Sequence, residues 1–140
     1  MNIFGDIAAN YLTFLALLKQ MPDDEVLSLG DFIDRGPRSK ETLEWFQLHG
    51  KAVLGNHEHM LLDSYLCSLD PNRKSYYSPG LWLDYNGGLA TLRSYKSDFD
   101  RNADQIHKVI PLSHIEYIQS LPLYLETDEL FLSHAPLKPR

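Results

Sequence analysis

A seven-residue stretch, Gly30-Asp31-Phe32-Ile33-Asp34-Arg35-Gly36, constrains the fold of this chain more than any other feature. It follows an apolar run at Val26–Leu29 that predicts a buried strand, and it ends in the turn signal Gly36-Pro37. Two carboxylates and a guanidinium are therefore expected in a loop at the carboxyl end of a strand, where ligands bind in open α/β sheets. Taken alone, a polar turn with Asp and Gly chosen for backbone reasons explains the stretch equally well.

Similar polar clusters recur at the ends of other predicted strands, which favours the functional interpretation. Asp6 follows the apolar run Asn2–Phe4, and Asn56 and His57 follow Ala52–Leu54. His134 follows a further apolar run near the end of the chain. Carboxylate, amide oxygen and imidazole are ligands for Mn, Fe or Zn. A pair of such ions, bridged by a carboxylate, could generate the hydroxide for in-line attack on phosphorus.

Helical and strand patterns alternate along the first half of the chain, which predicts an α/β fold with a parallel sheet. Asn10 and Ser39 are the expected N-caps of the first two helices, and the spacing of Ser113 and Glu116 predicts a capping box further on. The remaining expected segments are a helix from Glu58, helices at Leu89–Tyr95 and Ala103–Ile110, a loop at Asp70–Gly80, and a hairpin of Leu123–Glu126 with Leu130–Leu132. Because no repeat or linker is visible, residues 1–140 are expected to form a single domain.

Charge and composition exclude several classes of protein. The net charge of -6 argues against a nucleic-acid-binding surface, which is normally basic. A single cysteine, Cys67, excludes an intrachain disulfide. No apolar run approaches the length of a membrane span, and the N-terminus lacks the pattern of a signal peptide. We therefore expect a cytoplasmic protein that binds neither membrane nor nucleic acid.

The motifs together resemble those of metal-dependent serine/threonine phosphoprotein phosphatases of the bacterial and bacteriophage type, within the calcineurin-like metallophosphoesterases. The resemblance covers nearly the whole chain, and diadenosine tetraphosphate hydrolases are close relatives. The matching segments are Gly30–Gly36 (G-D-x-(V/I)-D-R-G), Gly55–Glu58 (G-N-H-E), Gly5-Asp6-Ile7 (the start of G-D-x-H-G), Ser133-His134-Ala135 (the later histidine motif), Trp82 with Asn86-Gly87-Gly88, and Leu121-Pro122-Leu123.

The resemblance implies a role for each matching residue. Asp6 would bind a first metal ion, Asp31 would bridge two ions, and Asn56 and His134 would bind the second. The catalytic residues implied are His57 as general acid, Asp34 as the carboxylate that holds it, and Arg35 as the ligand of the phosphoryl oxygens. Each role suits the bare chemistry of its side chain.

Two departures from the family pattern affect these expectations. Ala8 and Ala9 stand where the family has His-Gly, so the first metal loses an imidazole ligand. The chain also ends at Arg140, before the family's second sheet with its further histidine and arginine. We therefore expect only the N-terminal half of the family's β-sandwich with flanking helices, at most one tightly held ion, and a dimer or larger assembly through exposed edges.

The expected function is metal-dependent hydrolysis of phosphomonoesters, on a phosphorylated protein or a small phosphoester, with activity impaired by Ala8 and Ala9. The alternatives are a diadenosine tetraphosphate-type hydrolase and a non-catalytic descendant that binds a metal or a partner. Tyr76, Tyr77 and Trp82 could line a substrate groove or serve as packing residues, and the sequence alone leaves both open. His59 lies at a position that the motif leaves free, and a solvent-facing or capping role is favoured.

Overall fold

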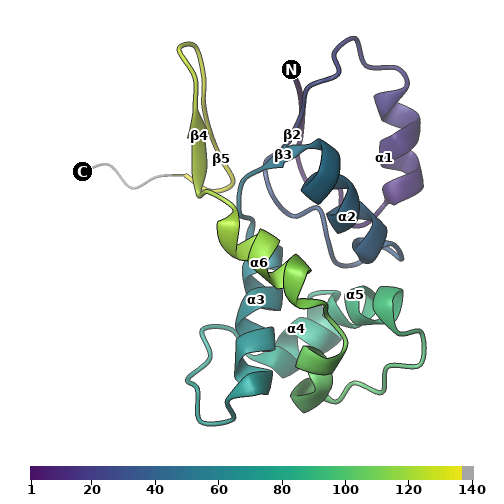
Figure 1. Cartoon of the computed structure of the whole chain (residues 1–140), viewed down its shortest axis with the longest axis vertical. Helices are drawn as coiled ribbons and strands as arrows, with labels where there is room; N and C mark the ends of the chain where they lie inside the picture. Colours follow the sequence, from purple (N-terminus) through teal and green to yellow (C-terminus); the bar gives the residue numbers. More distant parts are fainter. Residues whose placement is uncertain (137–140) are drawn as a thin grey trace.

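A computed structural model describes residues 1–136, and it contains the predicted parallel sheet with flanking helices. Figure 1 shows this sheet and its two covering helices at one end of the molecule and a group of helices at the other. The elements in chain order are β1 (Asn2–Phe4), α1 (Tyr11–Leu18), β2 (Val26–Ser28), α2 (Ser39–His49), β3 (Lys51–Ala52), α3 (Asn56–Leu69), α4 (Pro79–Tyr85), α5 (Gly88–Tyr95), the 3-10 helix η1 (Ala103–Lys108), α6 (Leu112–Ser120), β4 (Tyr124–Glu126) and β5 (Phe131–Ser133).

The three parallel strands lie in the order β1-β2-β3, with Ile3 paired to Leu27 and Leu27 to Lys51. Both crossover helices cover the same face of this sheet. Phe14 on α1 contacts Phe4 on β1 edge-on at 5.1 Å between ring centroids, and it stacks on Phe46 of α2 at 5.4 Å. The antiparallel hairpin of β4 and β5 lies on the other side of the sheet (Figure 1).

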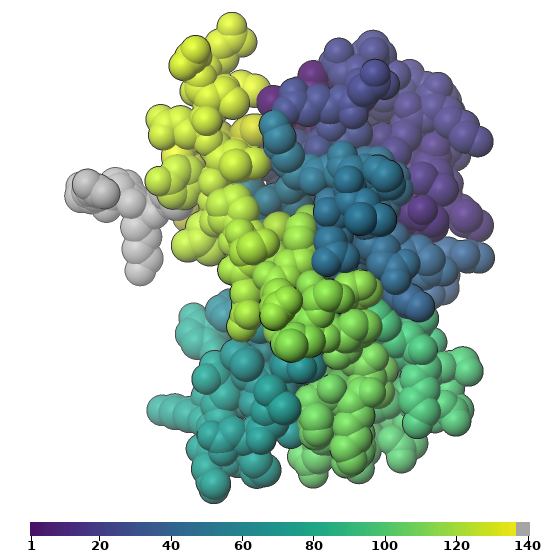
Figure 2. Space-filling view, viewed as in Figure 1, coloured from purple at the N-terminus to yellow at the C-terminus, as the bar shows by residue number. Residues whose placement is uncertain are grey.

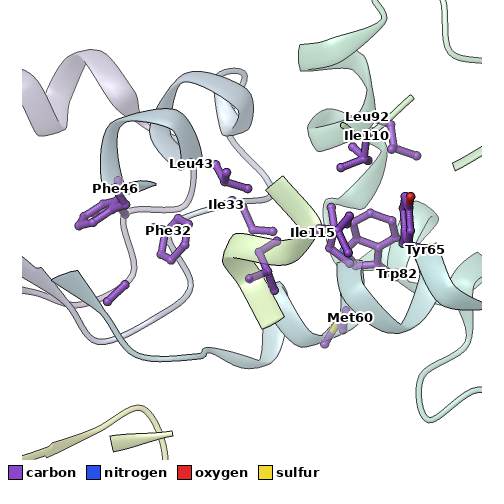
Figure 3. Close-up of a cluster of buried hydrophobic side chains, with 14 of the residues drawn as sticks. Phe32, Ile33, Leu43, Phe46, Met60, Tyr65, Trp82, Leu92, Ile110 and Ile115 are labelled. Carbon is purple, nitrogen blue, oxygen red and sulfur yellow. The ribbon is translucent and has the colours of Figure 1, made fainter. Parts of the chain in front are cut away.

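A continuous hydrophobic core joins the sheet to the helical end. In Figure 3, Phe32 and Phe46 mark the part of the core near the sheet, and Trp82 marks the part among the helices. Ile33 and Ile115 lie between them. Helix α6 therefore packs between the sheet and the helical end of the molecule. In Figure 2 its surface crosses the middle of the molecule. Asp31 and Asp34 therefore flank residues of the buried core, Phe32 and Ile33.

Several local predictions were wrong. Ser39 and Asn10 do not cap helices through their side chains: Ser39 is the first residue of α2, and the Asn10 amide donates back to the carbonyls of Ile7 and Ala8. The expected capping box at Ser113 is absent, because α6 begins at Leu112 after Pro111. Asn10 does occupy the N-cap position of α1 as predicted, but without a side-chain capping bond, whereas the N-caps of α2 and α6 lie one and two residues before the expected ones.

Other elements differ in extent or were missed. β3 is two residues long rather than three, and the expected helix at 103–110 is a 3-10 helix that ends at Lys108. Helix α4 begins at Pro79, within the segment expected to be a loop up to Gly80. Ser78 caps α4 by accepting from the Leu81 N–H, and Pro79 suits its first position. This N-terminal signal is present in the sequence, inside the segment predicted as a loop.

Candidate active site

Four loops with polar side chains meet at one edge of the parallel sheet. Because β1, β2 and β3 run in the same direction, the segments that follow Phe4, Ser28 and Ala52 leave the sheet at the same edge. A fourth segment, which carries His134 after β5, reaches the same edge because the His134 ring contacts the Leu29 carbonyl. The structure thereby brings together residues that are up to 105 positions apart in the chain.

The backbone of these loops is strained. Five residues other than glycine have a left-handed conformation, which costs roughly 1–2 kcal/mol each. They are Ala8 (φ 48°), Ala9 (φ 56°), Asp31 (φ 56°), Asp34 (φ 66°) and Arg35 (φ 65°). Hydrogen bonds between the loops hold this geometry, among them Ala8 N–H to the Asp31 carbonyl at 3.0 Å and Gly36 N–H to the Ala8 carbonyl at 3.1 Å. Strain of this kind gathers at functional sites, where the surrounding fold supports it.

Glu58 joins the loop after β2 to the loop after β3. Its buried carboxylate accepts backbone N–H groups of Asp31 at 2.8 Å, Phe32 at 3.0 Å, Ile33 at 3.3 Å and Gly55 at 3.1 Å. Complete burial raises the pKa of Glu58 to about 7, while the backbone donors act in the opposite direction. The sequence placed Glu58 in the G-N-H-E motif and at a helix start without assigning it a partner, although its position three residues after Gly55 is that of a capping box.

His57 and Asp34 form a buried pair. The Nδ1–H of His57 donates to Asp34 Oδ2 at 2.7 Å, and this hydrogen bond raises the pKa of His57. Trp82 Nε1–H donates to the same carboxylate oxygen at 2.7 Å, and the Thr91 hydroxyl donates to Oδ1. Asp34 is thus held by donors from α4 and α5, and it fixes both the tautomer and the orientation of the imidazole. Neither Trp82 nor Thr91 had been assigned this contact from the sequence.

Arg35 lies beside the other nitrogen of His57. Its Nη2–H donates to His57 Nε2 at 3.3 Å, and the Arg35 side chain is otherwise exposed. The turn at Asn86-Gly87-Gly88 supports the Arg35 backbone, because the Arg35 N–H donates to the Gly87 carbonyl at 3.3 Å. A side chain at Gly87 would overlap the Arg35 backbone, and one at Gly88 would overlap the Trp82 ring. These close approaches explain the two adjacent glycines.

The side chains of His134, Asn56 and Asp31 turn one acceptor atom each toward a common point. The Leu29 carbonyl can only accept, so His134 donates to it from Nδ1, at 2.8 Å, and its Nε2 is unprotonated in the neutral ring. Nε2 lies 2.8 Å from Asn56 Oδ1 and 3.5 Å from Asp31 Oδ1. A ring that donates one N–H to a carbonyl and turns the other nitrogen toward acceptors is the usual arrangement of a metal-ligating histidine. The donor set therefore fits a divalent ion.

Asp6 and Ala8 line a narrow cavity together with Asp31, Arg35 and His57. Asp6 is exposed, and the Ala8 methyl group offers no ligand there. Within residues 1–136, no group of three or more His, Cys, Asp or Glu side chains is placed to hold an ion. The position beside His134 and Asp31 has three candidate ligands only when the amide oxygen of Asn56 is counted. The position beside Asp6 has fewer candidate ligands, because Ala8 offers none.

The model of the family "Calcineurin-like phosphoesterase" matches residues 2–139. The chain belongs to this family. The metallophosphoesterase prediction is therefore confirmed at the level of family and fold. No helix in the part of the chain that the structure describes is long and apolar enough to cross a membrane.

Curated metallophosphoesterase relatives match parts of the chain. It is 40% identical over 91 residues to a serine/threonine-protein phosphatase 2 of Salmonella typhimurium, and the matched segment covers 59% of this chain and 39% of that protein. It is 43% identical over 61 residues to a symmetrical bis(5'-nucleosyl)-tetraphosphatase of Methylobacillus flagellatus, covering 39% of this chain and 22% of the relative. A zinc-dependent endopolyphosphatase of Saccharomyces cerevisiae is 35% identical over 74 residues, covering 44% of this chain and 22% of the relative.

Solved structures show the same fold. A metallophosphoesterase from Sphaerobacter thermophilus matches with a TM-score of 0.60 and 21% identity over 92% of this chain and 44% of that chain. A putative diadenosine tetraphosphatase matches with a TM-score of 0.63 and 23% identity, over 99% of this chain and 50% of that chain. The chain thus spans half or less of the length of these relatives and neighbours.

Proposed function

We propose that this chain forms the core of a metal-dependent phosphoesterase that hydrolyses phosphomonoesters. One observation carries the proposal. The lone-pair donors of Asp31, Asn56 and His134 converge beside the buried pair of His57 and Asp34, with the Arg35 guanidinium next to the His57 ring. A cation site beside a histidine and an arginine suits phosphoryl transfer, because the cation and the arginine stabilise charge on the transferred group and the histidine can supply a proton.

Asp31, Asn56 and His134 would hold one divalent ion, of Mn, Fe or Zn. When bound, such an ion supplies Lewis-acid stabilisation of charge on phosphorus and lowers the pKa of a bound water. Asp6 would contribute to a second position that Ala8 leaves incomplete. We therefore infer at most one tightly held ion per chain and weak activity.

The chain's own residues supply the remaining chemistry. Arg35 is free to turn its exposed guanidinium toward phosphoryl oxygens, which it suits as a planar fork of donors. His57 then loses the Arg35 contact at Nε2 and is able to carry a proton there for the leaving oxygen. Asp34 favours the imidazolium, because its hydrogen bond raises the pKa of His57. The buried pair therefore prepares a general acid that faces the phosphoryl position.

Two substrate classes remain candidates. A phosphorylated serine or threonine side chain is the first, and it is supported by the 40% identity over 91 residues to the Salmonella phosphatase. A nucleotide substrate is the second, and it is supported by the 43% identity over 61 residues to the Methylobacillus tetraphosphatase. If the ion site is too weak for turnover, the fold would instead act as a non-catalytic metal- or partner-binding protein.

Metal titration by calorimetry, combined with hydrolysis of 4-nitrophenyl phosphate, tests the proposal. We expect one Mn²⁺ site that His134→Ala and Asn56→Ala each weaken by at least about 10-fold, the range seen when metal-site partners are lost. We expect slow hydrolysis that requires the metal. Retention of metal affinity in both variants would refute the assigned ligands, and metal binding without any hydrolysis would favour the non-catalytic alternative.

Arg35→Ala provides an independent test of the phosphoryl site. Removal of a charged hydrogen-bond donor costs about 1.5–3 kcal/mol, so phosphate or vanadate binding should weaken by roughly 10- to 100-fold with little loss of stability. Arg38→Ala is the matched control, because Arg38 is exposed and pairs with Glu41 at 3.2 Å. If Arg35→Ala unfolds the protein while the folded fraction binds phosphate normally, Arg35 is structural.

A further inference from the structure

Two buried hydroxyl groups contact Asp34 from helices that lie away from the sheet edge. Ser39 is the first residue of α2 and Thr91 lies in α5, and they are 0% and 1% exposed. Their hydroxyl oxygens are 2.7 Å apart, although the residues are 52 positions apart in the chain. We call Ser39 and Thr91 the hydroxyl pair. Because both residues are closed off from solvent, any effect of the pair on the reaction must pass through Asp34.

The hydroxyl pair holds Asp34 at two points. The backbone N–H of Asp34 donates to Ser39 Oγ at 3.0 Å and to Thr91 Oγ1 at 3.1 Å. The Thr91 hydroxyl also donates to the carboxylate oxygen Oδ1 of Asp34. Asp34 has a left-handed backbone with φ of 66°, which a residue other than glycine keeps only when its surroundings support it. The pair therefore fixes both the main chain and the carboxylate of this residue.

The number of protons leaves the hydroxyl pair one arrangement. A hydroxyl group has a single proton to donate and two lone pairs to accept with. Because the Thr91 proton goes to Asp34 Oδ1, the Ser39 hydroxyl donates to Thr91 Oγ1, and Ser39 Oγ accepts the Asp34 N–H. The donors thus run in one direction, from Ser39 through Thr91 to the carboxylate. Hydrogen bonds in such a buried chain polarise and strengthen one another.

Thr91 acts on the carboxylate oxygen that His57 does not use. His57 and Trp82 both donate to Oδ2 of Asp34. Among residues 1–136, Thr91 is the only residue whose side chain donates to Oδ1. Because both oxygens are held, the carboxylate cannot turn about its Cβ–Cγ bond, and Oδ2 stays directed at His57 Nδ1. Without the Thr91 hydroxyl, Oδ1 would be a buried acceptor with no side-chain donor, and that rotation would be free.

A separate contact between α2 and α5 keeps the hydroxyl pair in register. Ser94 Oγ accepts the backbone N–H of Lys40 at 3.1 Å and donates to the Thr91 carbonyl at 2.6 Å. The start of α2 is therefore fixed to α5 by groups that do not touch Asp34. The arrangement around the carboxylate is thus built into the fold before any substrate binds, as preorganised sites require.

We propose that Ser39 and Thr91 are positioning residues for His57, which they act on through Asp34. They hold the carboxylate, and with it the imidazole, in the orientation in which Nε2 faces the phosphoryl position. Neither residue touches the reacting atoms. The consequence for catalysis rests on the function proposed above, whereas the orientation of the His57 ring does not depend on it.

Proton NMR of the full chain, labelled with nitrogen-15, tests the orientation without any hydrolysis. The Nδ1–H resonance of His57 is identified by its loss in His57→Gln. We expect Thr91→Val, which keeps the side-chain shape and removes the hydroxyl, to shift this resonance upfield or lose it through exchange with water. Thr91→Ser restores the hydroxyl and should retain the resonance. Thr42→Val is the matched control, because Thr42 is 0% exposed and donates to the Arg38 carbonyl at 2.8 Å.

Hydrolysis of two esters by the Mn²⁺-loaded protein tests the consequence for the general acid. Phenoxide is a more basic leaving group than 4-nitrophenoxide, so phenyl phosphate needs the proton of His57 more. We expect Thr91→Val to lower kcat for phenyl phosphate by at least about 10-fold, within the roughly 100-fold to 10,000-fold that general acid catalysis contributes, and kcat for 4-nitrophenyl phosphate by less. KM should stay unchanged for both esters, because Arg35 and the candidate metal ligands are untouched.

The other outcomes separate this proposal from the proposed function. If Thr91→Val leaves the His57 resonance and both kcat values like those of Thr42→Val, the positioning role is refuted and the phosphoesterase proposal stands. If the resonance depends on the Thr91 hydroxyl while no form hydrolyses either ester, the positioning role stands and the phosphoesterase proposal is refuted. Equal losses of kcat for the two esters would refute an effect on the general acid. Should Thr91→Val fail to fold, Ser39→Ala replaces it, with a smaller change expected in the same direction.

Discussion

Trp82 donates its indole N–H to Asp34 Oδ2 at 2.7 Å, across 48 positions of sequence. Both residues are fully buried, and Asp34 Oδ2 also accepts the Nδ1–H of His57. Helix α4 therefore fixes a carboxylate of the central motif, and that carboxylate fixes the candidate general acid. The helical end of the molecule thus contributes to the site even though the candidate ligands and His57 lie at the sheet edge.

Trp82→Phe removes this donor while it keeps most of the ring. Leaving a buried acceptor such as Asp34 Oδ2 without one of its donors costs about 1–3 kcal/mol, so the free energy of unfolding measured in urea should fall by that amount. Hydrolysis should also slow, because the His57 ring loses part of its support. Trp45→Phe is the control, since Trp45 is half-buried and packs edge-on against Phe14 at 4.8 Å. Equal losses in both variants would mean that ring volume, not the hydrogen bond, matters.

Gly55→Ala should disrupt the junction of the two loops that carry the candidate ligands Asp31 and Asn56. A side chain at Gly55 would overlap the Asp31 carboxylate, the Asp31 backbone and the Glu58 carboxylate. Overpacking of this kind typically costs about 1–3 kcal/mol, and Mn²⁺ affinity should fall with it because Asp31 must move. Gly80→Ala is the control: its added Cβ would meet only Ser78 Oγ, at 3.8 Å. Urea unfolding and metal titration report the two effects, and unchanged metal affinity in Gly55→Ala would show that Asp31 is not a ligand.

His114 should make stability depend on pH outside the site. It is 5% exposed and accepts a hydrogen bond from the Tyr95 hydroxyl at 2.8 Å. Burial lowers the pKa of His114. The charge of Lys40 also lowers this pKa, and the charge of Glu44 raises it. The unfolded chain then binds a proton near pH 6.5 more readily than the folded one, so stability is lost as the pH falls below that value.

Urea unfolding at pH 7.5 and 5.5 measures this contribution. We expect the change in unfolding free energy from pH 7.5 to pH 5.5 to favour the folded state more in His114→Gln than in the unmodified chain, because Glu58 and His57, whose pKa values are raised in the folded state, act equally in both forms. His49→Gln is the control, because His49 is exposed near the end of α2. An equal pH dependence in His114→Gln and the unmodified chain would show that His114 does not titrate differently on folding.

The sequence predicted the sheet edge well and the supports of the site poorly. Asp31 and Asn56 could be grouped from strand patterns, because parallel strands end at a common edge. His134 follows β5 of the separate antiparallel hairpin, so the polar cluster at a strand end and the family resemblance grouped it with them, not the sheet topology. Glu58, Trp82 and Thr91 could not be assigned their contacts, since these depend on how α3, α4 and α5 pack against the loops. A buried donor to a carboxylate leaves no periodic pattern in a sequence. The helix starts at Leu112 and Ser39 were missed because the expected caps Ser113 and Ser39 lie two residues and one residue after the actual N-caps, Pro111 and Arg38.

Replacement of Ala8 by histidine should restore a second ion site. Ala8 lines the same narrow cavity as Asp6 and Asp31, and both Ala8 and Ala9 have a left-handed backbone, with φ of 48° and 56°. Ala9→Gly relieves one of these strained positions, and combined with Ala8→His it adds an imidazole to the two carboxylates. Loss of a residue that only supports a metal ligand costs about 10–100-fold in affinity or activity, so a direct ligand should matter at least as much.

We therefore expect one tight Mn²⁺ per unmodified chain and two in the double variant, with faster hydrolysis of 4-nitrophenyl phosphate. Ala9→Gly alone is the control, because it relieves the backbone without adding a ligand. Metal titration by calorimetry on all three forms decides the matter. If the unmodified chain already holds two ions tightly and turns over the ester readily, the imidazole absent at Ala8 is dispensable, and Asp6 and Asp31 suffice for the first ion.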